Sequence, residues 1–295
     1  MNDPAFAAPF FATVDDHRTV VVLEDGAARD LCEVLHGAVD ESPDHARACL
    51  PAAIAAWPEI EKVARAVVGR PWESVVVRAP IPRPINVLGA PVNFRAHQGE
   101  LGAERSSKGT VQDMGLFVKA SGSVSGPDSS VTLPDLPGRE FHYEGEIAIV
   151  IGAGGLDLDR EAARAAIAGF TGALDVTMRL ETDHREERSM RKSFASFTPT
   201  GPAVLPAAPG MEETLGLRLS VNGELRQEGT LAQLIVGAVD LVMLASSVIE
   251  LEAGDLILLG TPQGVGPLSP GDKVRLDVDG LPPLELDVAR RRGPS

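Results

Sequence analysis

Apolar and polar residues alternate in short runs over most of the chain, and this pattern predicts a strand-rich protein. From Ile85 onward, β-branched and apolar runs are separated by turns that contain glycine, proline or aspartate. The runs are INVLGA, GLFVKA, SVTLP, GEIAIVIG, LRLSVNG, DLILLG and KVRLDVDG. Two stretches are typical of helices, REAARAAIAG after Asp159 and TLAQLIVGAVDLVMLAS from Thr230, and we expect these two residues to act as N-caps. The predicted class is α+β, dominated by strands.

The first 80 residues differ in character from the rest. The segment RTVVVLE predicts a strand, and a helix-favouring, alanine-rich stretch runs from Ala27 to Val68. Three prolines interrupt that stretch: Pro43, Pro51 and Pro58. The proline cluster in RAPIPRPINVLGAPVNF marks a boundary near residue 80. We therefore expect a small N-terminal domain over 1–80, a larger catalytic domain over 81–290 and a basic tail over 291–295.

Composition and charge limit the classes of partner that the chain is expected to bind. Of the 295 residues, 44% are hydrophobic and 23% charged, which is the composition of a folded globular protein. The formal net charge of −15 repels phosphate backbones and anionic membrane surfaces, so we expect neither nucleic acid nor membrane as a partner. An anionic substrate would need local positive charge from arginine, lysine or a bound metal.

The chain carries no sign of export or of a membrane span in its sequence. Its two cysteines, Cys32 and Cys49, are too few for a disulfide framework. The N-terminal segment MNDPAFAAPFFATVDD contains acidic residues and prolines where a signal peptide needs a basic start and an apolar run. No run approaches ~20 uninterrupted apolar residues. We expect a cytoplasmic protein.

The segment YEGEIAIVIG carries the clearest candidate chemistry. Side chains on a strand alternate between its faces, so Glu144 and Glu146 should point the same way with neighbouring carboxylates. Such like charges need a cation or a shared proton to offset their repulsion; the alternative is a solvated pair on an edge strand. Asp175 ends another apolar stretch, IAGFTGALD, and favours the first interpretation. Three carboxylates suit a hard cation such as Mg²⁺ or Mn²⁺.

Seven segments, in order, give the chain a resemblance to a known family. They are LGAPVNFRAHQGE, LFVKASGSVSGP, FHYEGEIAIVIG, ALDVTMR, RKSFASFTPTGP, SVNGELRQEGT and LEAGDLILLGTPQGVGPLSPGD. Over residues 85–288 the chain thus resembles the fumarylacetoacetate hydrolase family. The resemblance implies a mixed β-sandwich roll with a smaller N-terminal domain, assembled as a homodimer. It also implies Glu144, Glu146 and Asp175 as metal ligands, with Mg²⁺ or Mn²⁺ as the cofactor and Ca²⁺ as an alternative.

The resemblance further implies a catalytic base. His97 and Glu100, in NFRAHQGE, have the family's His-x-x-Glu spacing. His97 would remove a proton from water while Glu100 orients the imidazole and supports its protonated form. The alternative is a surface histidine beside an unrelated carboxylate. His142, next to the two glutamates, is a weaker candidate for a supporting role at the metal.

The resemblance implies a third catalytic residue and a set of substrate-binding residues. Lys192 in RKSF corresponds to a family lysine near the metal and substrate oxygens and is the third catalytic candidate, although a solvated lysine is the plain alternative. Arg179 would grip the substrate carboxylate through two parallel hydrogen bonds. Gly260 and Thr261 begin a Gly-Thr-Pro tripeptide whose hydroxyl and backbone N–H would receive a carboxylate, unless the tripeptide is only a turn.

These roles imply an enzyme acting on a 2-oxo acid. The leading hypothesis is a metal-dependent hydrolase that cleaves a C–C bond in an acylpyruvate-like 1,3-diketo acid through a metal-stabilised enolate. The alternatives are a decarboxylase or keto-enol tautomerase of a 2-oxo diacid at the same site, and a non-catalytic family paralogue. Thr182 stands near the position where many relatives carry glutamine, so the substrate's side group stays open.

Overall fold

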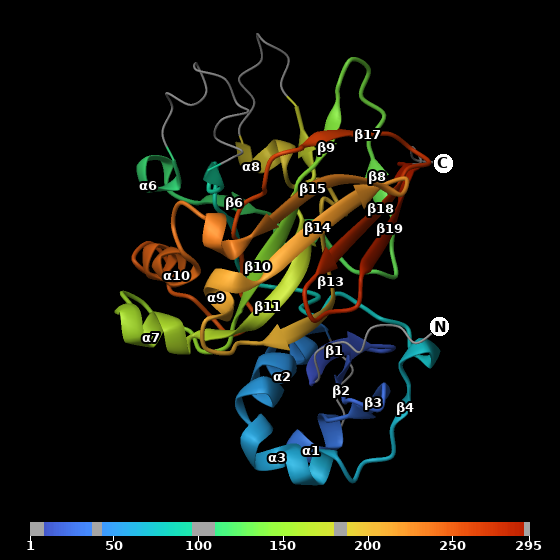
Figure 1. The fold of residues 1–295 in the computed structure, drawn as a ribbon, viewed down its shortest axis with the longest axis vertical. Coiled ribbons are helices and arrows are strands. Elements are labelled where there is room, and N and C mark those ends of the chain that lie inside the picture. Colours follow the sequence, from blue (N-terminus) through green and yellow to red (C-terminus); the bar gives the residue numbers. More distant parts are fainter. Residues whose placement is uncertain (1–8, 37–42, 96–109, 180–187, 292–295) are drawn as a thin grey trace.

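The computed structural model describes residues 9–36, 43–95, 110–179 and 188–291 (Figure 1). Its strands form three sheets with only short helices around them, which confirms the predicted strand-dominated α+β class. The N-terminal strands and the helices α1, α2 and α3 gather at one end of the molecule, and the longer strands of the chain's second half fill the other end (Figure 1).

The largest sheet has eleven strands and runs through the molecule's centre. Its order is β4-β3-β2-β1-β13-β11-β10-β16-β5-β6, with β7 pairing to β13. The bounds are β1 Phe10–Val14, β2 Arg18–Val22, β3 Ala27–Asp30, β4 Arg70–Pro71, β5 Val87–Gly89, β6 Phe117–Lys119, β7 Val124–Ser125, β10 Gly145–Ile151, β11 Ile167–Leu174, β13 Thr198–Pro206 and β16 Leu256–Leu258. Strand β1 pairs with β13, so the N-terminal strands extend the same sheet that contains β10.

There are two smaller sheets, and the five-stranded one packs on β10 and β11 of the largest sheet. The five-stranded sheet has the order β15-β14-β18-β19-β8, and the three-stranded sheet has the order β12-β9-β17. Their bounds are β8 Val131–Leu133, β9 Phe141–Tyr143, β12 Thr177–Met178, β14 Gly216–Val221, β15 Glu224–Thr230, β17 Gly266–Leu268, β18 Lys273–Val278 and β19 Leu284–Arg290. All seven side-chain positions of β10 are buried, because both of its faces are covered.

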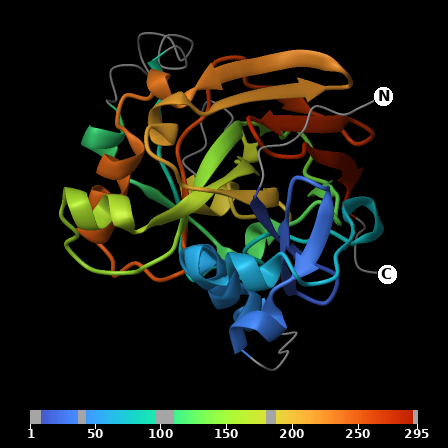
Figure 2. The ribbon, with the colours of Figure 1, turned by 60° about the horizontal axis from the view of Figure 1, so that its bottom comes forward.

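Helices are short and lie at the margins of the sheets. They are α1 Cys32–His36, α2 Pro43–Ala55, α3 Trp57–Ala64, α6 Val111–Met114, α7 Arg160–Ala165, α8 Arg188–Arg191, α9 Met211–Thr214 and α10 Ala238–Ser246, with 3-10 turns η1 Trp72–Ser74, η2 Ser121–Ser123 and η3 Leu231–Gln233. Helix α2 packs against β1 and β2, as Figure 2 shows from below. No helix among the described residues is long and apolar enough to cross a membrane.

The structure corrects several local expectations. The predicted helical stretch begins as strand β3, because Ala28 pairs with Val22 of β2. Pro51 lies inside α2 and does not interrupt it. Asp159 caps α7 as expected, accepting from the N–H of Ala162 over 2.9 Å. Thr230 precedes only the 3-10 turn η3, and the helix α10 starts later, at Ala238.

Candidate metal and substrate site

Two neighbouring strands bring the three predicted metal ligands together. Glu144 directly precedes β10, Glu146 is the second residue of that strand, and Asp175 follows the last residue of β11. The strands are antiparallel, and their register sets Gly145 opposite Leu174. The N–H of Asp175 donates to the carbonyl of Glu144 over 2.8 Å. Residues about thirty positions apart in sequence therefore meet at one edge of the pair.

The three carboxylates form a compact buried cluster. One carboxylate oxygen from each of Glu144, Glu146 and Asp175 lies within 4.8 Å of the other two. The exposed fractions are 6% for Glu144, 3% for Glu146 and 1% for Asp175. These values exclude the alternative of a solvated pair of glutamates on an edge strand.

The Gly-Thr-Pro tripeptide lies directly beside this cluster. Strand β16 pairs with β10, so the chain that leaves β16 passes next to the start of β10. The N–H of Gly260 donates to Oε2 of Glu146 over 2.6 Å. Gly260 has a φ of +101°, and a Cβ there would lie 2.9 Å from the Cβ of Asn93. Only glycine fits this backbone position, so the tripeptide is more than an incidental turn.

Two of the predicted cationic residues contact the carboxylates. The Lys192 ammonium, 6% exposed, donates to Glu144 Oε2 over 2.9 Å, to Thr177 Oγ1 over 2.7 Å and to Asp175 Oδ2. These three bonds use all of its protons, so Lys192 is not a solvated surface lysine. Arg179 donates from Nη2 to Glu144 Oε1 over 2.8 Å.

A second buried lysine, Lys119, was not singled out from the sequence. It ends strand β6, is 1% exposed, and donates to Asp175 Oδ1 and to the carbonyl of Phe197, the latter over 3.1 Å. Phe117 precedes it by two residues, and the Lys192 ammonium lies 4.9 Å from the centre of that ring. A lysine on the inward face of an apolar strand was the available signal, because a buried ammonium needs an anionic partner.

The environment of Glu146 indicates whether a metal cation suits the carboxylate cluster. Burial raises the pKa of Glu146 well above its ordinary value, and the negative charges of Asp175 and Glu144 raise it further. In the described part of the chain, no lysine or arginine contacts Glu146, and the Gly260 N–H is its hydrogen-bond donor. Three buried carboxylate groups, of which Glu146 contacts no cationic side chain in the described residues, have the chemistry of a site for a hard divalent cation. The residues therefore fit Mg²⁺ or Mn²⁺.

Of the remaining sequence candidates, His142 is the one that lies in the described residues. His142 lies on β9 with Nε2 3.2 Å from Glu140 Oε2, and its pKa is lowered by burial and then by the Arg179 charge. His97, Glu100 and Thr182 lie outside the described residues.

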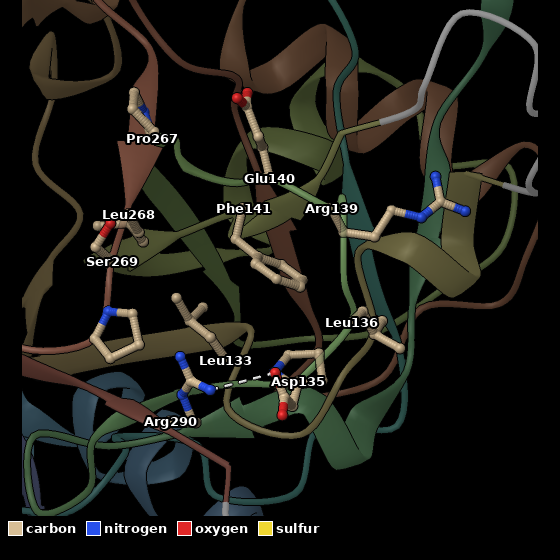
Figure 3. A pocket seen from close by; sticks show the side chains of 12 residues that line it. Leu133, Asp135, Leu136, Arg139, Glu140, Phe141, Pro267, Leu268, Ser269 and Arg290 are labelled. Carbon is tan, nitrogen blue, oxygen red and sulfur yellow. Dashed lines mark hydrogen bonds and ion pairs between the residues drawn. The ribbon is translucent and has the colours of Figure 1, made fainter.

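A separate hollow of about 320 Å³ is lined in part by Phe141 of β9 (Figure 3). Arg290 points toward Asp135 at one edge of this hollow, with a nitrogen–oxygen distance of 3.4 Å. The lining residues are Leu133, Pro134, Asp135, Leu136, Arg139, Glu140, Phe141, Pro267, Leu268, Ser269, Pro270 and Arg290. None of them is a candidate site residue, so this hollow is distinct from the carboxylate cluster.

Comparison with known proteins places these features in a wider group. Residues 86–289 match the family model described as fumarylacetoacetate hydrolase C-terminal. The chain is 35% identical to the maleylpyruvate hydrolase of Aquipseudomonas alcaligenes over 71% of this chain and 74% of that protein. It is 32% identical to the oxaloacetate tautomerase YisK of Bacillus subtilis over 72% and 73%, respectively.

A solved structure shows the same fold. The maleylpyruvate hydrolase from Sphingobium sp. SYK-6, in complex with manganese(II) and pyruvate, superposes with a TM-score of 0.81 at 31% identity. The match covers 96% of this chain and 100% of that one.

Proposed function

The chain belongs to the fumarylacetoacetate hydrolase family, and from that premise we propose that it is a divalent-metal-dependent hydrolase of an acylpyruvate-like 1,3-diketo acid. The observation that carries the proposal is the buried cluster of Glu144, Glu146 and Asp175 within 4.8 Å, edged by cationic and N–H donors. A cluster of this kind suits a substrate that is itself an anionic chelator. A 2-oxo acid, with adjacent carboxylate and keto oxygens, has that chemistry.

In this proposal Glu144, Glu146 and Asp175 hold the cation. Bound there, the cation would supply Lewis acidity toward the 2-oxo end and offset the negative charge that develops during the reaction. Lys192 and Lys119 fix the direction of the Asp175 carboxylate, because each donates to a different oxygen of it. The Lys192 contact with Glu144 couples the two ligands.

Arg179 and the tripeptide receive the substrate's carboxylate. Arg179 uses Nη2 on Glu144, and within the described residues its other guanidinium N–H groups have no acceptor, which leaves them for a planar, bidentate contact. The Gly260 N–H donates to the Glu146 carboxylate, which supports the proposal that this stretch of backbone presents N–H donors to anions. Binding at both places orients the diketo acid with its scissile bond near the metal ligands.

The assignment of the catalytic base comes from the His-x-x-Glu pattern in the sequence. We assign His97 to take a proton from water and Glu100 to orient its imidazole. The oxygen of that water forms a bond to the distal keto carbon, and the C–C bond between this carbon and the pyruvate methylene breaks. The electron pair passes to the pyruvate part, which takes up a proton. The products are pyruvate and a carboxylic acid.

A second candidate function is keto-enol tautomerisation of a 2-oxo diacid. The similarity to an oxaloacetate tautomerase, at 32% identity, favours it, and the same cation and arginine would bind such a substrate. Tautomerisation moves only a proton, whereas hydrolysis also requires a placed water. The two functions thus differ in what the base acts on.

Incubation of the Mn²⁺-loaded protein with a panel of acylpyruvates and with oxaloacetate, followed by NMR, separates these functions. Pyruvate and a free acid from an acylpyruvate support the hydrolase. Faster enol–keto interconversion of oxaloacetate without acylpyruvate cleavage supports the tautomerase. Tight Mn²⁺ binding with no turnover of either class would support a non-catalytic paralogue and overturn both proposals.

A further inference from the structure

Gln227 is a buried polar side chain on an otherwise exposed strand. Strand β15 is exposed at five of its seven positions, but Gln227 points inward and is 1% exposed. Burying an amide is costly unless its polar atoms are paired. Its side chain reaches between the start of β10 and the Gly-Thr-Pro tripeptide, so its partners belong to the candidate site.

Both ends of this amide are used at the site. Oε1 of Gln227 accepts from the N–H of Gly145 over 2.8 Å. Nε2 donates to Thr261 Oγ1 and to the carbonyl of Pro262, each over 2.8 Å. The side chain therefore connects the backbone between the two metal-site glutamates to the tripeptide.

The Thr261 hydroxyl both accepts and donates a hydrogen bond within the protein. It accepts from Gln227 and donates its proton to the carbonyl of Gly145 over 2.9 Å. A hydroxyl has a single proton to donate, so Thr261 Oγ1 has none left for a substrate carboxylate in this arrangement. Within the described residues, the backbone N–H of Thr261 has no hydrogen-bond acceptor. That N–H follows the Gly260 N–H, which already contacts Glu146.

Gly145 is held from two directions by the same pair. Its N–H goes to Gln227 and its carbonyl receives the Thr261 hydroxyl. A Cβ at position 145 would lie 2.8 Å from Leu219 Cδ1 and 3.2 Å from Gln227 Oε1. The glycine between the glutamates thus lets Gln227 approach the backbone closely.

We propose that Gln227 is a positioning residue that locks the Thr261 hydroxyl onto Gly145 and so presents the backbone N–H of Thr261 to the substrate carboxylate. Thr261 then binds substrate through its main chain, and its side chain serves as a brace. The inference rests on the proposed function, because it takes the ligand to be a 2-oxo acid. Loss of either member of the brace should free the tripeptide and weaken carboxylate binding more than metal binding.

The test is a double-mutant cycle with oxalate, whose paired carboxylates imitate the 2-oxo acid end. Calorimetry on Mn²⁺-loaded protein gives the oxalate dissociation constant for Gln227→Met, Thr261→Val and the double variant. Each single change should weaken oxalate binding about tenfold, the loss of a buried hydrogen bond. The double variant should bind no more weakly than the weaker single variant, because the two groups act as one unit. Thr261→Ser, which keeps the hydroxyl, should recover most of the affinity.

Matched measurements separate positioning from packing. Gln233→Met makes the same substitution at an exposed glutamine nearby and should leave oxalate binding unchanged. Multiplicative effects in the double variant, or equal weakening of Mn²⁺ and oxalate binding by Gln227→Met, would overturn the proposal. If Gln227→Met fails to fold, Gln227→Leu takes its place. If that also fails, recovery in Thr261→Ser but not in Thr261→Val supports the brace, and equal loss in both contradicts it.

The readout also separates this proposal from the hydrolase. Oxalate binding needs no turnover, so a wild-type protein that cleaves no acylpyruvate but shows the predicted cycle would retain the brace and lose the proposed reaction. A wild-type protein that cleaves acylpyruvates but shows independent effects at Gln227 and Thr261 would retain the reaction and lose the brace.

Discussion

The backbone N–H of Asp175 donates to the carbonyl of Glu144 over 2.8 Å, where β10 begins and β11 has just ended. This bond continues the ladder between the two strands, so the third carboxylate is fixed relative to the first by the sheet itself. A site carried on paired strands holds its geometry more closely than one carried on loops. The carboxylates can therefore stay close together even though they repel one another.

The raised pKa of Glu146 predicts that the metal-free protein loses folding stability as the pH rises. Its pKa in the folded state lies above the ordinary value of 4.5, so the folded state binds the proton more tightly than the unfolded state does. This contribution to stability is present below pH 4.5 and is lost as pH rises through the folded-state pKa. Glu146→Gln carries no such charge and should melt about 2–4 °C above wild type at pH 8, with a smaller gap at pH 5.

Calorimetric melting in chelator at both pH values measures this difference. Glu140→Gln, at a side chain that is 73% exposed, is the matched control and should melt with wild type at both values. A Glu146→Gln variant that melts below metal-free wild type at pH 8 would contradict the assignment of an uncompensated buried charge.

Removal of Lys119 should destabilise the fold strongly. Lys119→Met leaves Asp175, 1% exposed, without one of its two ammonium partners. Breaking a buried ion pair from one side costs about 3 kcal/mol, because the remaining charge stays buried. Urea unfolding in chelator should show this loss. Lys273→Met, where the lysine side chain is 79% exposed, should change stability by less than about 0.5 kcal/mol, and equal midpoints for the two variants would refute the prediction.

Arg179→Lys should damage substrate binding. The ammonium can keep one contact with Glu144 but cannot also offer a planar pair of donors to a carboxylate. We expect KM for the active substrate to rise about tenfold or more, with a smaller change in kcat. Arg160→Lys, on the exposed ion pair with Asp240, is the control and should match wild type. An unchanged KM in Arg179→Lys would remove this residue from the substrate site.

The proposed base predicts a loss in kcat without loss of metal. His97→Asn and Glu100→Gln should each lower kcat by about 10²–10⁴, the usual contribution of a general base. The double variant should be little worse than His97→Asn, because the two residues act together. Mn²⁺ affinity, measured in parallel, should stay at the wild-type value. Retention of full kcat in His97→Asn would mean that another group activates the water.

Much of the fold follows from local pattern. The alternation in GEIAIVIG sets the strand β10, and the turns between runs separate the later strands. Strand β3 lies where the alanine-rich run predicts a helix, because such a run favours helices in isolation, whereas pairing with β2 decides the outcome. Strand β13 contains three prolines and a cis Gly201–Pro202 bond, which hide its strand character.

Local sequence pattern predicts only part of the candidate site. Glu144 and Glu146 are close in sequence, so strand geometry alone indicates a cluster. Lys119 contacts Asp175 across 56 positions, and Gln227 contacts Gly145 across 82 positions. Local periodicity does not predict such long-range contacts. In the local sequence, such contacts are indicated by a polar residue on the inward face of a strand.

Mn²⁺ binding is the most direct test of the central claim, that Glu144, Glu146 and Asp175 hold a divalent cation. Calorimetric titration of wild type, Glu146→Ala and Glu140→Ala, each checked for folding by circular dichroism, carries it out. The structure predicts one Mn²⁺ per chain in wild type and Glu140→Ala, with affinity at least 100-fold weaker in Glu146→Ala, roughly the cost of losing a charged ligand. Equal Mn²⁺ affinity in a folded Glu146→Ala variant would contradict it.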